Sequence, residues 1–358
     1  MPAFRTGVVT ELLSRRSGFQ RVVVDDRPAY VLTDLVGQVG IGDRVVVNTT
    51  ALDRRLGTGG SDVVHWNLSN DTLDLPGRGH VMAARYTSVQ HDAGTWDTDE
   101  GPGAATAPHD TAALAASVPT IGCMLHSHAM ALCAALSAQG LSVGYVMNEA
   151  GALALALSDL LAASVEAGSV MVTASVGQAF GGEIEAVTVP SAVAGCAHSG
   201  AEIVVVGAGP GHVGTGDPLA FSGLSLAGDL DLLSLVGSPT ALALRWSSRD
   251  QRERHKGISH HSVTLLEVLA RSHAVPVPDA EMASAVADVL SGAGSDSQSR
   301  PVVIDPVDVV DACGRFGLDI DTMGRSLADD AAALKVIGST AAWGIGLSPD
   351  SRGSTGTL

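Results

Sequence analysis

The first 68 residues alternate short β-branched runs with Gly or Asp turns, about every eight to twelve residues. The runs are GVVTEL, FQRVVVD, AYVLTDL, DRVVVNTT and SDVVHWNL. Several closely spaced short strands are typical of small closed or sandwiched sheets. The pattern therefore predicts a small β-barrel domain at the N-terminus, over residues 1–90.

From Ser117 onward the pattern changes to strand, turn and helix, repeated several times. The expected strands are VPTIGCM, LSVGYVM, SVMVTAS, AEIVVVG, TALALRW, AVPVP and PVVI. Runs that are apolar on both faces, such as IVVV, belong in parallel sheets that helices cover on both sides. We predict a doubly wound, mostly parallel, Rossmann-like α/β domain that binds a ligand, over residues 117–345.

Three stretches have no apolar period and are expected outside the two domains' regular elements. Residues 91–116 are rich in Gly, Ala, Asp and Pro and predict a linker or a mobile flap. Residues 291–299 predict a surface loop, and residues 346–358 predict a disordered tail.

Residues 111–148 contain no Asp, Glu, Lys or Arg, so a membrane span is an alternative there. Pro119, His126 and His128 interrupt the run, and its period changes from that of a strand to that of a helix. These features favour a buried strand followed by a buried helix, and we expect no membrane association.

Composition narrows the functional class. The chain has 358 residues, 46% of them hydrophobic, with 21 basic and 38 acidic residues and a net charge of −17. An acidic chain with 3% aromatic residues lacks both the charge and the stacking surface that nucleic-acid binding requires. The four cysteines form no C-x-x-C pair and the N-terminus shows no secretory signal, so we expect reduced thiols and a cytoplasmic location.

Polar side chains gather where the predicted parallel strands end, which is where open α/β sheets bind ligands. Five such loops hold candidate ligand-binding or catalytic residues: His126, Ser127 and His128 after the first strand, Asn148 and Glu149 after the second, Gln178 after the third, residues 207–218 after the fourth, and residues 247–261 after the fifth. We expect these loops to converge on one crevice. Glu149 is a candidate proton carrier.

The fourth loop, GAGPGHVGTGDP, is rich in glycine. Gly209, Gly211 and Gly214 match G-x-G-x-x-G, and Thr215 and Gly216 follow them. Pro210 interrupts the motif, and no acidic strand end follows about twenty residues later, so a dinucleotide site is disfavoured. A nest of backbone amides that binds an anion is preferred, with a purely structural turn as the alternative.

The cationic segment at residues 245–256, RWSSRDQRERHK, runs from the end of the fifth strand into the fifth loop and has five basic and two acidic residues in an otherwise acidic domain. Its continuation, GISHHS, places Ser259 or Ser262 where either caps a helix that begins near His260. Arg254 and Lys256 are candidate anion ligands, and His260 and His261 are candidate acid–base groups. A solvated face with internal salt bridges is the alternative.

No metal site is predicted as the first choice. His255, His260 and His261 form an alternative metal-ligand set, although adjacent histidines splay apart on a helix and no H-x-x-x-H spacing completes the set. No G-x-S-x-G or Walker A motif occurs, and no cofactor can be assigned.

The segments GQAFGG, VVVGAGPGHVGTGDPLAFSG and RHKGISHHS resemble signature segments of an uncharacterised bacterial domain-of-unknown-function family. The resemblance covers most of the chain. In that family Thr-Asp stands near the strand end where this chain has Asn148 and Glu149. The resemblance implies no established activity.

Two functional hypotheses remain. The first is a cytoplasmic enzyme that acts on a small phosphorylated or carboxylated metabolite with histidine acid–base chemistry. The second is a non-catalytic sensor or assembly protein that uses the same crevice. The sequence leaves open whether the chain forms a homo-oligomer.

Overall fold

The structure is a computed structural model, and it describes residues 2–55, 60–77, 79, 81–97, 110–292 and 299–347. The chain divides into two compact units, Met1–Ala93 and Gly94–Leu358. Residues 98–109 of the predicted linker and residues 348–358 of the predicted tail lie outside the described residues, and residues 111–116 of the predicted linker belong to a helix. Much of the predicted loop at 291–299 lies outside them as well.

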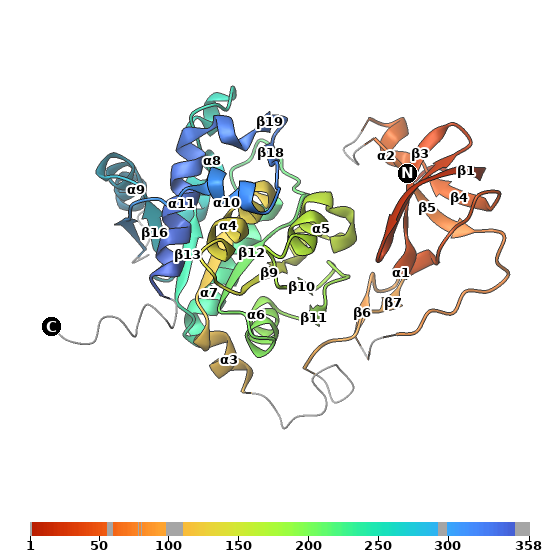
Figure 1. Cartoon of the computed structure of the whole chain (residues 1–358), viewed down its shortest axis with the longest axis horizontal. Coiled ribbons are helices and arrows are strands. Elements are labelled where there is room, and N and C mark those ends of the chain that lie inside the picture. The colour runs from red at the N-terminus through yellow and green to blue at the C-terminus, as the bar shows by residue number, and fades with distance from the viewer. Residues whose placement is uncertain are drawn as a thin grey trace. The chain divides into compact units, whose positions relative to one another are not determined.

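The smaller unit is a closed five-stranded barrel (Figure 1). Around the barrel the order is β1 (Phe4–Arg16), β2 (Phe19–Val24), β3 (Arg27–Leu32), β5 (Asp62–Asn67) and β4 (Arg44–Asn48). Short helices α1 (Thr33–Val36) and α2 (Thr50–Asp53) follow β3 and β4, and β6 (Met82–Ala83) pairs with β7 (His91–Asp92). Alternate valines such as Val22, Val24, Val45 and Val47 are fully buried inside. The predicted barrel is confirmed.

The larger unit is built on an eight-stranded sheet in which every pairing is parallel. The strand order is β11 (Ile184–Ala186), β10 (Val172–Val176), β9 (Val143–Met147), β12 (Ile203–Gly207), β8 (Thr120–Cys123), β13 (Thr240–Ala243), β16 (Ala274–Val277) and β17 (Arg300–Val303). All seven predicted strands are present. Strand β11 was not predicted because its three residues are too few to show a period.

Helices cover both faces of this sheet, which confirms the doubly wound α/β fold. On one face lie α3 (Thr111–Ser117), α6 (Val189–His198), α7 (Ser225–Val236), α8 (His260–Val268) and α9 (Ala280–Gly292). On the other lie α4 (His126–Ser137), α5 (Asp159–Glu166), α10 (Val309–Arg315) and α11 (Ala331–Ile345).

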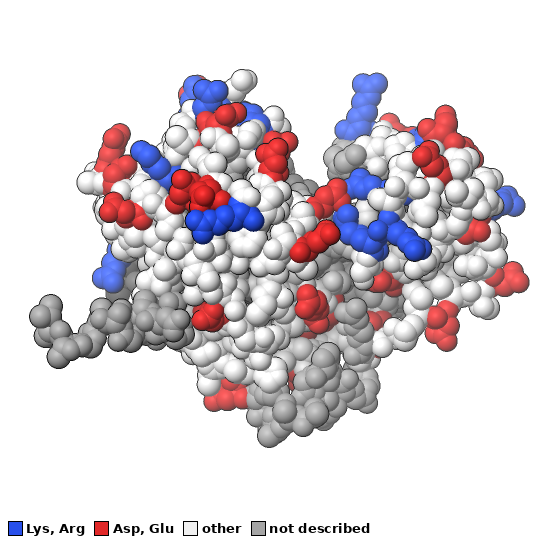
Figure 2. All heavy atoms as spheres, viewed as in Figure 1, with Lys and Arg blue, Asp and Glu red and all other residues white. Residues whose placement is uncertain are grey.

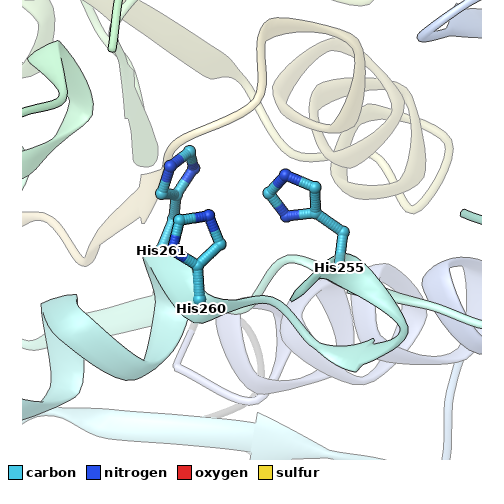
Figure 3. A group of neighbouring side chains, drawn as sticks. All are labelled: His255, His260 and His261. Atoms are coloured by element: carbon cyan, nitrogen blue, oxygen red, sulfur yellow. The ribbon is translucent and has the colours of Figure 1, made fainter. Parts of the chain in front are cut away.

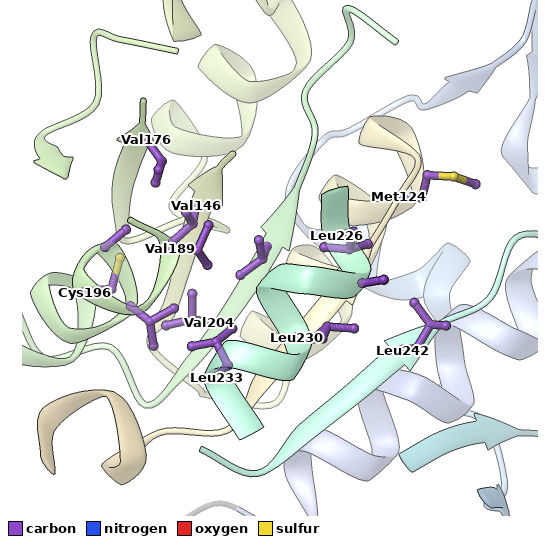
Figure 4. Packing of buried hydrophobic residues seen from close by; sticks show 14 of the residues in the cluster. Met124, Val146, Val176, Val189, Cys196, Val204, Leu226, Leu230, Leu233 and Leu242 are labelled. Atoms are coloured by element: carbon purple, nitrogen blue, oxygen red, sulfur yellow. The ribbon is translucent and has the colours of Figure 1, made fainter. Parts of the chain in front are cut away.

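Two hydrophobic cores therefore flank the sheet. In β12, Val204 and Val206 belong to the first core, and Ile203 and Val205 belong to the second. Figure 4 shows Leu226, Leu230 and Leu233 of α7 among the side chains of the first core. The unbroken run IVVV is explained because both faces of the strand are covered.

Short elements connect the main ones. They are the 3₁₀ turns η1 (Glu149–Gly151), η2 (Leu155–Leu157), η3 (Ser222–Leu224), η4 (Glu253–His255) and η5 (Leu327–Asp329), and the pairs β14 (Trp246–Ser247) with β15 (Gly257–Ile258) and β18 (Asp321–Thr322) with β19 (Arg325–Ser326). The segment at 111–148 forms α3, β8, α4 and β9 rather than one long helix. Within the described ranges, no helix has the length and apolar character needed to cross a bilayer.

The topology marks one place for a ligand. Strands β8 and β12 are neighbours, but the helix after β8 (α4) lies on one face and the helix after β12 (α7) lies on the other. Where two such connections diverge, the loops leave a crevice beyond the carboxyl ends of the strands. The loops after β8, β12 and β13 are therefore the ones to inspect.

Candidate functional site

A pocket of about 190 Å³ lies at the loops that follow β8, β12 and β13. Its lining joins the first residues after β8 with the glycine-rich loop after β12 and the cationic segment after β13. The lining residues are Met124, Leu125, His212, Val213, Gly214, Thr215, Phe221, Arg245, Arg252, Arg254, His255, His261 and Met323. The pocket thus lies where the strand connections diverge.

The charge of this lining is its main chemical feature. Three arginines and three histidines line the pocket, and among the described residues that line it none is Asp or Glu. On the face of the molecule drawn in Figure 2, acidic and basic side chains are interspersed. A basic lining in a chain of net charge −17 creates a local potential that attracts anions.

Two of the arginines are held in place by one buried carboxylate, that of Asp250. Arg252 donates to it through Nε (3.0 Å to Oδ1) and Nη2 (2.9 Å to Oδ2), which is a two-point contact. Arg245 donates to Oδ2 from its Nη2 atom at 3.1 Å. The hydrogen bonds from Arg252 lower the pKa of Asp250 well below its usual value, so the carboxylate is ionised at neutral pH.

Arg254 differs from these two arginines. It is exposed, lines the pocket and has no ion-pair partner among the described residues. Lys256, its predicted companion, does not line the pocket and pairs with Glu253. Arg254 is therefore the cation best placed to meet a ligand.

The start of α8 is fixed to the end of β13. The N–H of Ser259 donates to the Arg245 carbonyl at 2.9 Å, and the N–H of Arg245 donates to Ser262 Oγ at 2.8 Å. Ser259 is the N-cap of the helix and accepts a hydrogen bond from the N–H of His261. These bonds fix the first turn of α8, in which His261 lines the pocket and the predicted His260 does not. The amino end of a helix itself favours negative charge.

The histidines at the pocket are neutral near pH 7. Burial lowers the pKa of His255 to about 3, with Arg245 and Arg252 contributing in the same direction. Burial also lowers the pKa of His261 to about 4, with a further contribution from His260, and lowers the pKa of His260. Neutral imidazoles carry a lone pair on one ring nitrogen, which can accept a proton or bind a metal ion.

His212 has a different role, because both of its ring nitrogens are engaged. Its Nε2 donates to the Met124 carbonyl, and its Nδ1 lies 3.4 Å from Ser222 Oγ. The ring joins the loop after β12 to the loop after β8. His212 therefore shapes the pocket wall.

In the glycine-rich loop, most of the glycines are required by backbone conformation or close packing rather than by contact with the pocket. Gly209 has a φ of +66°, and a Cβ there would lie 2.8 Å from the sulfur of buried Met147. A Cβ on Gly211 would lie 2.5 Å from Leu153. Gly214 alone of the loop's glycines lines the pocket, whereas Gly216 is exposed with open space around its Cα.

Two backbone N–H groups of this loop form hydrogen bonds within the loop and are therefore not free to bind a ligand. The N–H of Thr215 donates to the Ala220 carbonyl at 2.9 Å, and the N–H of Val213 donates to Ser222 Oγ at 3.1 Å. The loop thus folds back on itself next to Phe221, with which Gly214 forms a β-bridge. A ligand would meet the Gly214 backbone and the Thr215 side of the loop.

We expect Gly209→Ala to lower the free energy of unfolding by about 1–3 kcal/mol, because Ala is strained at this φ and its Cβ collides with Met147. Gly216→Ala is the matched control in the same loop and should change it by less than about 0.5 kcal/mol. Urea denaturation measures both. Equal costs at the two positions would contradict this account of the loop.

The residues predicted after the first strand are drawn into the protein interior. His126 Nε2 lies 2.7 Å from Ser158 Oγ and its Nδ1 lies 3.1 Å from Tyr145 Oη. Ser127 Oγ lies 2.7 Å from Thr322 Oγ1, and His128 is buried. None of the three is among the pocket residues.

The residues predicted after the second and third strands also lie outside the lining. Asn148 is buried and donates to Asp229 Oδ2 at 2.7 Å and to Ser225 Oγ at 3.1 Å. Glu149 is exposed and lies beside Gly177, and Gln178 is half-buried. Of the five predicted loops, the structure brings together the first, fourth and fifth.

Some pocket residues were not singled out from the sequence. Met323 and Phe221 carry no local signal, because only the tertiary fold brings them to the pocket. In the sequence Asp250 is simply one of two acidic residues in the cationic segment. Its spacing from Arg245 and Arg252 is a signal that could have identified it as the residue that positions both arginines.

Fold and site together define a protein with a barrel unit and a doubly wound α/β unit, the latter bearing a basic pocket at its strand ends. The chain belongs to the DUF3866 family, described as proteins of unknown function, whose model matches residues 28–341. The resemblance to a domain-of-unknown-function family is thereby confirmed. No curated protein and no solved structure matches the chain.

Proposed function

We propose that this pocket binds the phosphate or carboxylate group of a small metabolite. The observation that carries the proposal is the lining, in which three arginines and no acidic residue occur among the described residues. Within the described part of the chain Arg254 has no ion-pair partner, and guanidinium groups bind anions strongly. The volume of about 190 Å³ suits one anionic group with a small body and is too small for a dinucleotide.

We propose an enzyme rather than a non-catalytic sensor, because His261 offers a neutral imidazole inside the pocket. A binding protein would be served equally well by charged groups alone. A neutral nitrogen beside a bound anion is instead equipped to take a proton or to hold a catalytic metal ion. Glu149 and His126 take no part in this proposal, since neither lines the pocket.

We further propose a cytoplasmic, bacterial protein. The support for the location is that the cysteines Cys123, Cys133, Cys196 and Cys313 are all free and buried, as in proteins of reducing compartments. The bacterial origin rests on the resemblance alone.

Binding of an anion should raise the melting temperature. At a concentration one hundred times Kd the stabilisation is about 2.7 kcal/mol, which corresponds to a shift of roughly 5–10 °C for a domain of this size. A thermal-shift screen of inorganic phosphate, sulfate, sugar phosphates and small carboxylates measures it. Arg254→Ala should weaken binding by roughly ten- to a hundredfold, because one charge-assisted contact is lost.

Arg300→Ala is the matched control, since Arg300 is also exposed in this unit but lies at the amino end of β17. It should leave the affinity unchanged. The proposal fails if no anion shifts the melting temperature or if both variants weaken binding equally. Conversion of the bound compound, followed by ³¹P or ¹H NMR, separates an enzyme from a sensor, which returns its ligand unchanged.

A further inference from the structure

We propose that His255, His260 and His261 bind one divalent metal ion, with zinc as the best match, and leave one coordination position open to the anion pocket. The proposal rests on the proposed function only for that fourth ligand, the anion. The three-histidine site stands on its own geometry.

The three side chains converge although they come from different parts of the segment. His255 ends η4, and His260 and His261 are the first two residues of α8. One ring nitrogen from each lies within 4.8 Å of the other two. Figure 3 shows the three rings on the same side of the backbone that joins them.

Adjacent side chains on a helix point about 100° apart, so the sequence alone disfavours His260 and His261 as ligands of the same metal ion. At the first turn of α8 the ring centroids of His260 and His261 nevertheless lie 4.1 Å apart. The ring centroid of His255 lies 4.9 Å from that of His260 and 5.3 Å from that of His261. Tetrahedral coordination with zinc–nitrogen bonds of 2.0–2.1 Å requires nitrogens about 3.3 Å apart. The nitrogens, which lie within 4.8 Å of one another, would have to approach by up to about 1.5 Å on metal binding.

The surroundings of each imidazole ring suit coordination of a metal ion. His255 Nδ1 lies 2.8 Å from Ser259 Oγ, which leaves its Nε2 available and orients the ring, as partners of metal-bound histidines do. His261 stacks on Phe221 with centroids 4.2 Å apart. His260 Nε2 is buried and has no hydrogen-bond partner among the described residues. An unsatisfied buried nitrogen is costly, and a metal ion would satisfy it.

The protonation state is also right for metal binding, since metal ligands must be deprotonated. The pKa values of all three imidazoles lie below the ordinary value of 6.5, so at pH 7 no proton has to be displaced. Imidazole nitrogens without a carboxylate or thiolate are a set that suits zinc, copper and nickel better than magnesium or calcium. Three histidines with an open fourth position are a known arrangement of catalytic zinc.

Arg245, Arg252 and Arg254 would repel a bare divalent cation. Asp250 offsets only part of their charge, and it is bonded to Arg245 and Arg252 rather than aimed at the histidines. An anionic oxygen that binds both the metal ion and Arg254 removes this repulsion. Metal and anion should therefore bind with positive cooperativity.

The test is titration of the full-length protein, first dialysed against a chelator, with ZnCl₂ by isothermal calorimetry. We expect one zinc per chain, and tighter zinc binding when inorganic phosphate is present. Replacement of bound zinc by Co²⁺ should give the visible absorption of a tetrahedral site. His260→Ala should weaken zinc binding by at least about a hundredfold. His260→Gln serves the same purpose if the alanine variant does not fold, as judged by circular dichroism.

His198→Ala is the matched control, since this exposed histidine lies on α6 beside Trp96. It should bind zinc like the unmodified protein. The inference is overturned if zinc does not bind stoichiometrically, or if His260→Ala and His198→Ala bind it equally. Phosphate binding without zinc binding defeats this inference and leaves the anion pocket intact. Zinc binding without any anion binding supports the three-histidine site and defeats the proposed anion pocket.

Discussion

Lowering the pH from 7 to 5 is expected to reduce the free energy of unfolding by at least about 4 kcal/mol, to which the lowered pKa of His261 adds. The cause is a set of histidines that are buried without a proton. Burial lowers the pKa of His126 and His128 to about 4 and that of His255 to about 3. In the unfolded chain each titrates near 6.5.

The sign follows from where each state binds protons. Below pH 6.5 the unfolded chain takes up protons on these three histidines while the folded chain does not, so stability falls as the pH falls. Each histidine contributes about 2 kcal/mol between pH 7 and 5. Burial acts oppositely on Asp229, whose pKa is raised to about 6, so its protonation in the folded state offsets part of the loss. Asp250 stays ionised throughout this range.

Urea denaturation of the full chain at the two pH values, followed by circular dichroism, measures the difference. His128→Leu should shrink the difference by about 2 kcal/mol, because one proton-binding group is removed from the unfolded state. Met130→Leu is the matched control, since Met130 is buried in the same helix and does not titrate. A stability that is flat between pH 7 and 5, or unchanged pH dependence in His128→Leu, would contradict this explanation.

The fold was predictable because its signals are local. Alternation along DRVVVNTT places Val45 and Val47 inside a barrel, and a run such as IVVV fits only a strand covered on both faces. The start of α8 was predictable for the same reason. Ser259 is a good N-cap and stands directly before the helix.

The candidate site was less predictable because its polar side chains form hydrogen bonds with residues that are distant in sequence. His126 and Asn148 stand at strand ends as the topology rule requires, but Tyr145, Ser158 and Asp229 satisfy them in the interior. Arg254 and Lys256 look equivalent in the sequence. They differ in the structure because Glu253 pairs with Lys256 and leaves Arg254 at the pocket.

Asp250→Asn is expected to destabilise the protein by about 3–5 kcal/mol, the usual cost of removing one partner of a buried ion pair. Asp250 is 3% exposed, and Arg245, its buried partner, is 6% exposed. Without the carboxylate, the guanidinium of Arg245 stays buried with no compensating charge. The two-point contact that orients Arg252 is lost as well. Urea denaturation at pH 7 measures the cost.

Glu253→Gln is the matched control, because its ion pair with Lys256 is exposed and contributes less than about 1 kcal/mol. Adding Arg245→Leu to Asp250→Asn should recover part of the lost stability, since the double variant buries no unpaired charge at this position. Equal effects of Asp250→Asn and Glu253→Gln would show that solvent screens the Asp250 carboxylate. In that case the Asp250 carboxylate would not be what positions Arg245 and Arg252 at the pocket.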